Sequence, residues 1–416
     1  MKIPGKYSFG LGDRFGHQGS AQLKAIISAA EKGVEITPVW NKSNREHKTI
    51  GTVPSDVRHE ADTVTAKAKF NKPYFVDADH INLETVDGFI DSSDFFTIDV
   101  ASYIGRKADQ GRIEKYISDS KCYSGGFRLA GTGKFFETNE KQIREITERY
   151  LHAALMAHEI YKKIELKKGK GNFITEISMD EVAQPQSPVE LFFILRMLAG
   201  EGIPVQTIAP KFSGRFNKGV DYKGDPMLFR KEFEEDLSVI EYTVKEFGLP
   251  EELKLSIHSG SDKFAIYPHI GAVIKQMNKG IHVKTAGTTW LEEIIGLAES
   301  GGEALEFTRG IYGEAIKRID ELTGPYADVI EIRSAALPSV IEISGWSSRK
   351  FSDALKHNPG NPGYNPDMRQ LMHVAYKLAA EREDEYFRLL DLNENKIAEC
   401  VYENIFNRHI SRLFCI

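Results

Sequence analysis

Three histidines stand at the carboxyl ends of short apolar runs or inside them. They are His80, His258 and His282. An apolar run that ends in carboxylates and imidazoles is typical of a buried parallel strand that delivers chemistry at its carboxyl end. Neutral imidazole is a ligand for zinc, manganese, nickel or cobalt, so three such side chains at one end of a barrel would bind one divalent ion. The alternative is that each histidine caps a strand or lies in a loop.

Two carboxylates accompany these histidines. Asp79 directly precedes His80, where a carboxylate could act as a ligand, a base or a partner of the imidazole. In the run 173–181, strand alternation places three polar side chains on one face: Glu176, Ser178 and Asp180. We expect Glu176 to face the barrel interior. Its alternative role is an ion pair with Lys211 or Lys284 inside the barrel.

Four cations are expected near an anionic or polyhydroxylated substrate: Arg14, Lys263, Lys284 and Arg369. Asp13, beside Arg14, is expected to belong to the same site. A uronate carboxylate favours a bidentate arginine, whereas a neutral hydroxymethyl group does not require one. For each cation the alternative is a solvated side chain or a structural salt bridge.

Eight strand-like runs alternate with helical segments and would position these side chains. The expected strands are 7–11, 34–40, 74–80, 95–99, 173–181, 205–212, 253–258 and 281–284. The expected helices include 20–30, 54–69, 83–90, 140–163, 188–199 and 227–247. This alternation predicts an α/β fold, a (β/α)₈ TIM barrel over residues 1–300, with a helical extension or cap over residues 301–416.

Composition limits the function classes. The formal charge is −6, with 41% hydrophobic and 27% charged residues, which is typical of a folded globular protein and disfavours general nucleic-acid binding. The three cysteines are scattered, which fits a reducing compartment. No signal region or membrane-length stretch appears, so we expect a cytoplasmic protein with no membrane partner. Self-association into a homo-oligomer is left open.

Several catalytic motifs are absent. Gly10, Gly12 and Gly16 miss the dinucleotide-binding spacing by one residue, and there is no phosphate-binding P-loop. The first strand lacks the His-x-His of metal-dependent amidohydrolases. Ser259 and Ser261 lack the Gly-x-Ser-x-Gly elbow of serine hydrolases.

The chain resembles the tagaturonate epimerases in eight sequence blocks that follow the same order from about residue 8 to 376. The blocks are FGLGDR (9–14), DADH (77–80), FTID (96–99), EISMDE (176–181), GVDYKGD (219–225), HSGSDKF (258–264), HVKTAGT (282–288) and RQLMHV (369–374). Members of that family carry an additional segment before the first block, whereas this sequence begins close to it. The resemblance implies a metal-dependent isomerase that interconverts tagaturonate and fructuronate, or the matching ketohexoses tagatose and fructose.

The resemblance also implies roles for individual residues. His80, His258 and His282 would be the divalent-metal ligands, Asp79 the proton acceptor and Glu176 the proton donor. The two uronates differ at a hydroxyl-bearing carbon two positions from the ketone, where simple enolisation cannot invert the centre. A retro-aldol cleavage followed by recombination on the other face of the aldehyde would produce the epimer.

Two alternatives remain open at this stage. A metal-dependent sugar or sugar-phosphate aldolase would use the same ligands and base but release two fragments, and the Gly-containing loops after the last two strands could then bind a phosphate. A non-catalytic sugar-binding barrel would keep the pocket without a poised acid and base.

Overall fold

Eight parallel strands close into a barrel in the computed structural model, which describes residues 2–129, 133–258, 262–285 and 287–416. The strands are β1 (Tyr7–Gly12), β2 (Ile36–Ser43), β3 (Phe75–Ile81), β4 (Phe95–Asp99), β7 (Ile174–Ser178), β8 (Thr207–Ala209), β9 (Lys254–His258) and β10 (Ile281–Lys284). β1 pairs with both β2 and β10, which closes the sheet. The predicted TIM barrel is confirmed. Residues 259–261 and Ala286, which belong to two of the eight blocks, lie outside the described residues.

Helices separate most of the strands. They are α1 (Gly19–Glu31), α2 (Asn44–Ile50), α3 (Pro54–Lys67), α4 (Gln110–Asp119), α5 (Glu140–Lys168), α6 (Pro188–Gly200), α7 (Pro226–Phe247), α8 (Tyr267–Met277) and α9 (Thr288–Ser300). A small antiparallel pair, β5 (Phe127–Arg128) and β6 (Phe135–Phe136), precedes α5. The expected helix at 83–90 is wrong, because only the 3₁₀ turn η1 (Val86–Gly88) lies between β3 and β4.

Local sequence explains where several helices begin and end. The hydroxyl of Ser187 accepts a hydrogen bond from the backbone N–H of Glu190, and the carboxylate of Glu190 accepts one from the backbone N–H of Ser187. This capping box, with Pro188 in the first turn, begins α6. Gly248 ends α7 in the left-handed conformation that glycine adopts without strain. Strand β7 ends at Ser178 rather than 181, so Asp180 lies in the loop beyond it.

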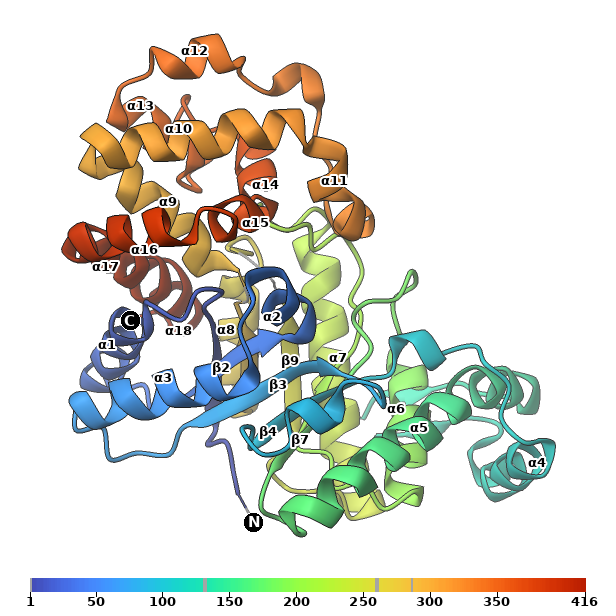
Figure 1. Cartoon of the computed structure of the whole chain (residues 1–416). Coiled ribbons are helices and arrows are strands. Elements are labelled where there is room, and N and C mark those ends of the chain that lie inside the picture. Colours follow the sequence, from blue (N-terminus) through green and yellow to red (C-terminus); the bar gives the residue numbers. More distant parts are fainter. Residues whose placement is uncertain (1, 130–132, 259–261, 286) are drawn as a thin grey trace.

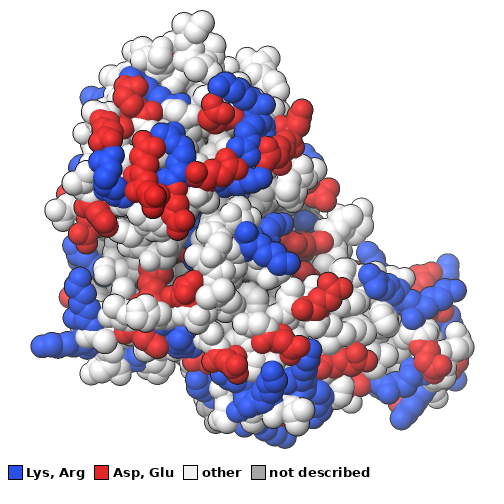
Figure 2. Space-filling view, in the orientation of Figure 1, with Lys and Arg blue, Asp and Glu red and all other residues white. Residues whose placement is uncertain are grey.

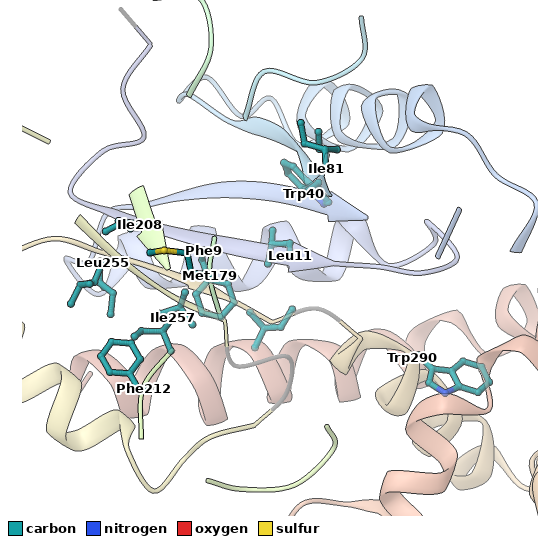
Figure 3. Close-up of a cluster of buried hydrophobic side chains, with 14 of the residues drawn as sticks. Phe9, Leu11, Trp40, Ile81, Met179, Ile208, Phe212, Leu255, Ile257 and Trp290 are labelled. Carbon is teal, nitrogen blue, oxygen red and sulfur yellow. The ribbon is translucent and has the colours of Figure 1, made fainter. Parts of the chain in front are cut away.

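Two layers of side chains line the barrel strands. Outward-facing residues such as Phe9, Leu11 and Ile257 are buried in the main hydrophobic core, and Figure 3 shows part of this cluster. Four inward-facing residues form a separate apolar cluster at the amino-terminal end of the barrel: Val39, Phe75, Phe95 and Ile174. The charged groups of the candidate site lie toward the carboxyl ends of the strands, as expected for a TIM-barrel active site, while Ser8, His282 and Lys254 are buried deeper in the barrel.

Residues 301–416 are helical and pack on one side and end of the barrel (Figure 1). The helices are α10 (Gly302–Lys317), α11 (Ile319–Thr323), α12 (Val340–Ser344), α13 (Ser348–Leu355), α14 (Pro366–Val374), α15 (Tyr376–Ala380), α16 (Glu383–Leu392), α17 (Glu394–Tyr402) and α18 (Ser411–Phe414). α9 ends at Ser300, at the expected boundary, while the division into two domains stays a prediction.

Charged side chains of both signs are interspersed over the face of the molecule seen in Figure 2. Within the described ranges, no helix combines the length and the apolar character needed to cross a membrane. The three cysteines, Cys122, Cys400 and Cys415, are all free thiols.

Candidate active site

His80, Asp180 and His258 come together at the carboxyl ends of β3, β7 and β9. One ligand atom from each lies within 4.8 Å of the other two. The Oδ1 atom of Asp180 is 3.4 Å from Nε2 of His80 and 3.3 Å from Nδ1 of His258. Two ligands of a tetrahedral ion with bonds of about 2.0–2.1 Å are separated by about 3.3 Å. These three residues, called the ligand cluster below, therefore fit a divalent metal ion.

The backbone at His80 departs from an ordinary strand. Its φ angle is +53°, a left-handed conformation that costs a non-glycine residue about 1–2 kcal/mol. The pairing of β3 with β4 shifts register between Ala78 and Ile81. Consecutive strand residues normally point to opposite faces, but this irregularity lets Asp79 and His80 both turn toward the site. The strained backbone conformation therefore lies at a residue that belongs to the candidate site.

A carboxylate holds the second nitrogen of each histidine in the ligand cluster. Asp79 Oδ1 lies 2.8 Å from Nδ1 of His80, and Glu176 Oε1 lies 2.8 Å from Nε2 of His258. The remaining nitrogens are the ones that face Asp180. Nδ1 of His258 is buried, and its 3.3 Å contact with Asp180 is not aligned as a hydrogen bond. This is the carboxylate–histidine arrangement that orients metal-binding imidazoles.

Lys284 joins the buried carboxylates beneath the ligand cluster. Its ammonium lies 2.7 Å from Asp77, 2.7 Å from Asp79 and 3.3 Å from Glu176, and we call these four residues the lysine network. Glu176 therefore faces the barrel interior and also makes the ion pair that was its alternative role. Thr97 donates a hydrogen bond to Asp77 or Glu176, and Thr207 donates to Glu176 at 2.7 Å. All four members of the network are buried.

The charges of these groups depend on one another. Burial opposes the ionised form of Glu176, but Lys284 and His258 more than offset it and hold the pKa of this carboxyl well below its usual range. Burial also opposes the charged form of His258, yet Asp180 and Glu176 raise its pKa to about 9. Asp77 behaves differently, because burial raises its pKa to about 7 despite Lys284. The network therefore contains one carboxyl group that can carry a proton near neutral pH.

His282 is not brought to the ligand cluster. It pairs in register with Ser256, whereas Lys284 pairs with His258. Two residues along a strand correspond to about 6–7 Å, so His282 lies one layer deeper in the barrel. Its Nδ1 is 2.9 Å from the hydroxyl of Ser8, and burial lowers its pKa to about 3. Its Nε2 is buried and has no hydrogen-bond partner among the described residues. In this geometry Asp180, not His282, completes the ligand cluster.

Asp13 and Arg14 are both committed to contacts within the protein. The carboxylate of Asp13 accepts hydrogen bonds from four backbone amides, of residues 15–18, and so fixes the turn into α1. Arg14 pairs with Glu46 at 3.0 Å and donates to the backbone carbonyl of His373 at 2.6 Å. The structural alternative thus describes Asp13 well, while Arg14 bridges the barrel and the C-terminal helices.

Lys263 and Arg369 are both buried and bind groups of the protein itself, which is the structural alternative to a substrate clamp. Lys263 donates to the backbone carbonyls of Asn217 and Val220 at 2.8 and 2.7 Å. Arg369 donates to the carbonyls of Gly219 and Leu355, and pairs with Asp262 at 2.9 Å. Both cations therefore tie the β8–α7 loop to neighbouring segments.

Sequence reasoning missed two acidic residues at this site. Asp180 was placed on the face of Glu176 but was not singled out as a ligand, although that shared face was a usable signal. Asp77 precedes Asp79 by two residues and therefore shares its face of β3, which could have identified it as a partner of Lys284.

Comparisons with known proteins decide the family. A model of the UxaE family, the tagaturonate epimerases, matches residues 2–413. The chain belongs to the tagaturonate epimerase family. It is therefore an epimerase, which is an isomerase, as its sequence blocks predicted.

Individual relatives agree with this assignment to the tagaturonate epimerases. The tagaturonate/fructuronate epimerase of Thermotoga maritima is 28% identical over 423 residues, which is 98% of this chain and 80% of that protein. A glycerol-complexed crystal structure of fructuronate-tagaturonate epimerase UxaE from Cohnella laeviribosi has the same fold. Its TM-score is 0.82 at 24% identity, over 99% of this chain and 82% of the other. The native structure of the Cohnella laeviribosi protein gives 0.81.

Metal affinity is expected to rise with pH below about 9. The neighbouring carboxylates hold the pKa of both His80 and His258 above the usual value, so both rings carry protons near neutral pH in the metal-free chain. Binding must displace these protons, and affinity gains about tenfold per pH unit for each proton released. Calorimetric titration with Zn²⁺ or Mn²⁺ between pH 6 and 9, in buffers of different ionisation enthalpy, counts them. A pH-independent affinity without proton release would contradict this ligand assignment.

Proposed function

We propose that this epimerase interconverts tagaturonate and fructuronate, using a divalent metal ion held by His80, Asp180 and His258. One observation carries the proposal. Asp79 and Glu176 each hold one histidine of the ligand cluster, and both also contact the ammonium of Lys284. Two proton-transfer groups and a cation are thus joined beside a metal-binding group, as an aldol-type inversion requires.

The inverted carbon carries a hydroxyl group and a C–H bond that the ketone does not acidify. Removing the hydroxyl proton allows the carbon–carbon bond toward the ketone to break, which leaves an aldehyde and an enediolate. The chemistry supplied by a bound divalent ion is Lewis-acid stabilisation of negative charge. When the aldehyde presents its other face, re-formation of the same bond gives the epimer.

The residues of this chain divide the proton transfers between them. Asp79 accepts the hydroxyl proton. Glu176 is ionised in the resting enzyme, so it becomes the proton donor only after that proton has been passed on to it, and the roles are exchanged in the reverse direction. Lys284 lies 2.7 Å from Asp79 and 3.3 Å from Glu176, so a proton can pass between the two carboxylates without entering bulk water. The ligand cluster is the open side of this arrangement, since 19% of the His80 side chain and 22% of the Asp180 side chain are exposed.

Isotope exchange tests the bond that breaks. During turnover of either uronate in deuterium oxide, the hydrogen on the inverted carbon is expected to be retained, because its C–H bond stays intact. Asp79→Asn and Glu176→Gln are expected to weaken metal binding by no more than the about 10–100-fold that is usual for residues that orient metal ligands. At saturating metal they are expected to lower turnover by a factor on the order of 10² or more. Nuclear magnetic resonance of the products, together with metal analysis, checks both expectations.

Three outcomes would contradict the proposal in different ways. Deuterium on the inverted carbon would indicate direct deprotonation instead of carbon–carbon cleavage. Accumulation of two smaller carbonyl compounds would indicate an aldolase. Full turnover by metal-free protein would show that the reaction does not require the metal. Assays with tagatose and fructose alongside the uronates establish which substrate class is preferred.

A further inference from the structure

Two cations from distant parts of the chain converge on one aromatic ring beside the barrel mouth. The guanidinium of Arg45 lies 4.7 Å from the ring centroid of Tyr326, and the ammonium of Lys218 lies 5.6 Å from it. Arg45 is exposed and Lys218 is half-buried. Among the described residues, neither forms an ion pair with a carboxylate within 4.0 Å, in contrast to Lys284, Arg14 and Arg369.

The position of Arg45 relates these cations to the ligand cluster. Arg45 follows Ser43 by two residues, and Ser43 pairs in register with Asp79 on β3. The nearest acidic neighbours are Glu46 and Glu181, whose negative charges act on both cations. Glu181 directly follows Asp180 of the ligand cluster. The two cations therefore lie at the rim of the site and are incompletely neutralised.

A second aromatic ring and a buried histidine extend this group of residues toward the protein interior. The guanidinium of Arg14 lies 3.9 Å from the ring centroid of Tyr376, whose hydroxyl is 3.0 Å from that of Tyr326. His373 is fully buried, and neither of its ring nitrogens has a hydrogen-bond partner among the described residues. A buried imidazole without partners is costly unless a ligand satisfies it.

The amino terminus of α9 points to the same place. Gly287 caps this helix with a φ of +80°, and a Cβ atom there would lie 2.6 Å from Nη2 of Arg14 and 2.9 Å from Nε2 of His373. Only glycine permits this close approach. A helix amino terminus carries partial positive charge, which adds to that of the surrounding cations.

We propose that Arg14, Arg45 and Lys218, called the cationic cluster, together with the unpartnered imidazole of His373, bind the terminal anionic group of the substrate, and that this group is a carboxylate. The inference rests on the proposed function, because it places the far end of a keto-uronate here while the ketone end faces the ligand cluster. Arg45 and Lys218 make the direct contacts. Arg14 and the start of α9 sustain the positive potential behind them. Burial and the neighbouring cations hold the pKa of His373 well below its usual range, so this imidazole stays neutral and offers a hydrogen bond rather than a charge.

This assignment predicts which substrates the enzyme prefers. A carboxylate satisfies cations that a hydroxymethyl group leaves unpaired, so keto-uronates should be selected over neutral ketoses. A phosphate ester also ends in an anionic group, so an experiment must distinguish it from a carboxylate. Lys263 and Arg369, which are occupied by carbonyls and by Asp262, contribute only to the background potential.

Binding of non-reactive probes tests the cationic cluster without turnover. D-gluconate, D-glucitol and D-glucitol 1-phosphate differ only in the group at carbon 1, and none of them has a ketone or an aldehyde. Titrations use metal-free protein, because carboxylates also chelate metal ions. The wild type should bind gluconate more tightly than glucitol, and the double variant Arg45→Gln/Lys218→Met should weaken gluconate binding on the order of 10-fold or more. The kcat/KM ratio of tagaturonate to tagatose should fall by a similar factor.

A matched control lies on the same loop. Arg215 and Lys223 are exposed and both pair with Glu331, so Arg215→Gln/Lys223→Met removes the same two side-chain types away from the cluster. This control should retain wild-type gluconate affinity. The proposal would be overturned if both double variants behaved alike, if wild-type protein did not distinguish gluconate from glucitol, or if only glucitol 1-phosphate lost affinity in the cluster variant.

The same experiments separate this inference from the proposed function. The metal-loaded wild type could fail to epimerise any keto-uronate while gluconate binding still depends on Arg45 and Lys218. In that case the proposed function would be wrong and the anion site would be supported. Should epimerisation proceed with an unchanged uronate-to-ketose ratio in the cluster variant, the function would stand and the anion site would be wrong.

Discussion

His258→Ala and Asp180→Asn are each expected to lower metal affinity by more than about 100-fold and to reduce turnover to background. Both residues belong to the ligand cluster, and Asp180 Oδ1 is within 3.4 Å of a nitrogen of each histidine. Even residues that only orient metal ligands change affinity by about 10–100-fold, so loss of a ligand should have a larger effect. Metal content after dialysis and steady-state turnover of tagaturonate check the two effects together.

His282 supplies the control that separates the two ligand sets. His282→Gln keeps a polar side chain next to Ser8 in the deeper layer, so metal content and turnover should stay close to those of the wild type if Asp180 is the third ligand. Loss of metal in His282→Gln with retention in Asp180→Asn would support the three-histidine set predicted from the sequence. Retention of full metal content in His258→Ala would exclude both sets.

The barrel could be predicted from sequence because its signals are local. Each strand is a short, largely apolar run of four to eight residues in the structure, apart from the three-residue β8, and β2, β4, β7 and β8 are followed by helices with a side-chain cap. The run 173–181 also predicted the inward face correctly, since Glu176 is buried inside the barrel and Met179 in the surrounding core. Strand periodicity fixes which residues share a face, and in a closed barrel that suffices to find the interior.

The depth of a side chain along the barrel could not be predicted in the same way. His282 and Lys284 share a face, but only the register of β10 with β9 places Lys284 beside His258 and His282 one layer below. The left-handed backbone of His80 likewise depends on the register shift between β3 and β4. Both features arise from pairing between strands that are distant in the sequence.

The sequence also could not predict which cations are buried, because burial depends on tertiary packing. Lys263 and Arg369 resemble Arg45 and Lys218 in residue type, yet the first pair is enclosed by backbone carbonyls and Asp262. Arg45 and Lys218 are instead left at the rim, where the C-terminal segment contributes Tyr326. The ring that brings the two cations together lies more than a hundred residues further along the chain.

Lys284→Met is expected to lower the free energy of unfolding by about 3–5 kcal/mol, the usual cost of removing one partner from a buried ion pair. The substitution leaves Asp77, Asp79 and Glu176 without their shared cation in the barrel interior. The three carboxylates then repel one another, and the orientation of His80 and His258 depends on two of them. Turnover should therefore fall even in the fraction that remains folded.

Chemical denaturation of the metal-free protein, followed by circular dichroism, measures this loss, and a double-mutant cycle with Asp77→Asn identifies its origin. Asp77 pairs with Lys284 at 2.7 Å and burial raises its pKa to about 7, so replacing it by a neutral amide should partly relieve the repulsion. The double variant should be less destabilised than the sum of the two single variants, with a coupling on the order of 1 kcal/mol or more. Strict additivity, or a stable and active Lys284→Met variant, would show that the buried carboxylates are neutralised by protons and that Lys284 does not hold the site together.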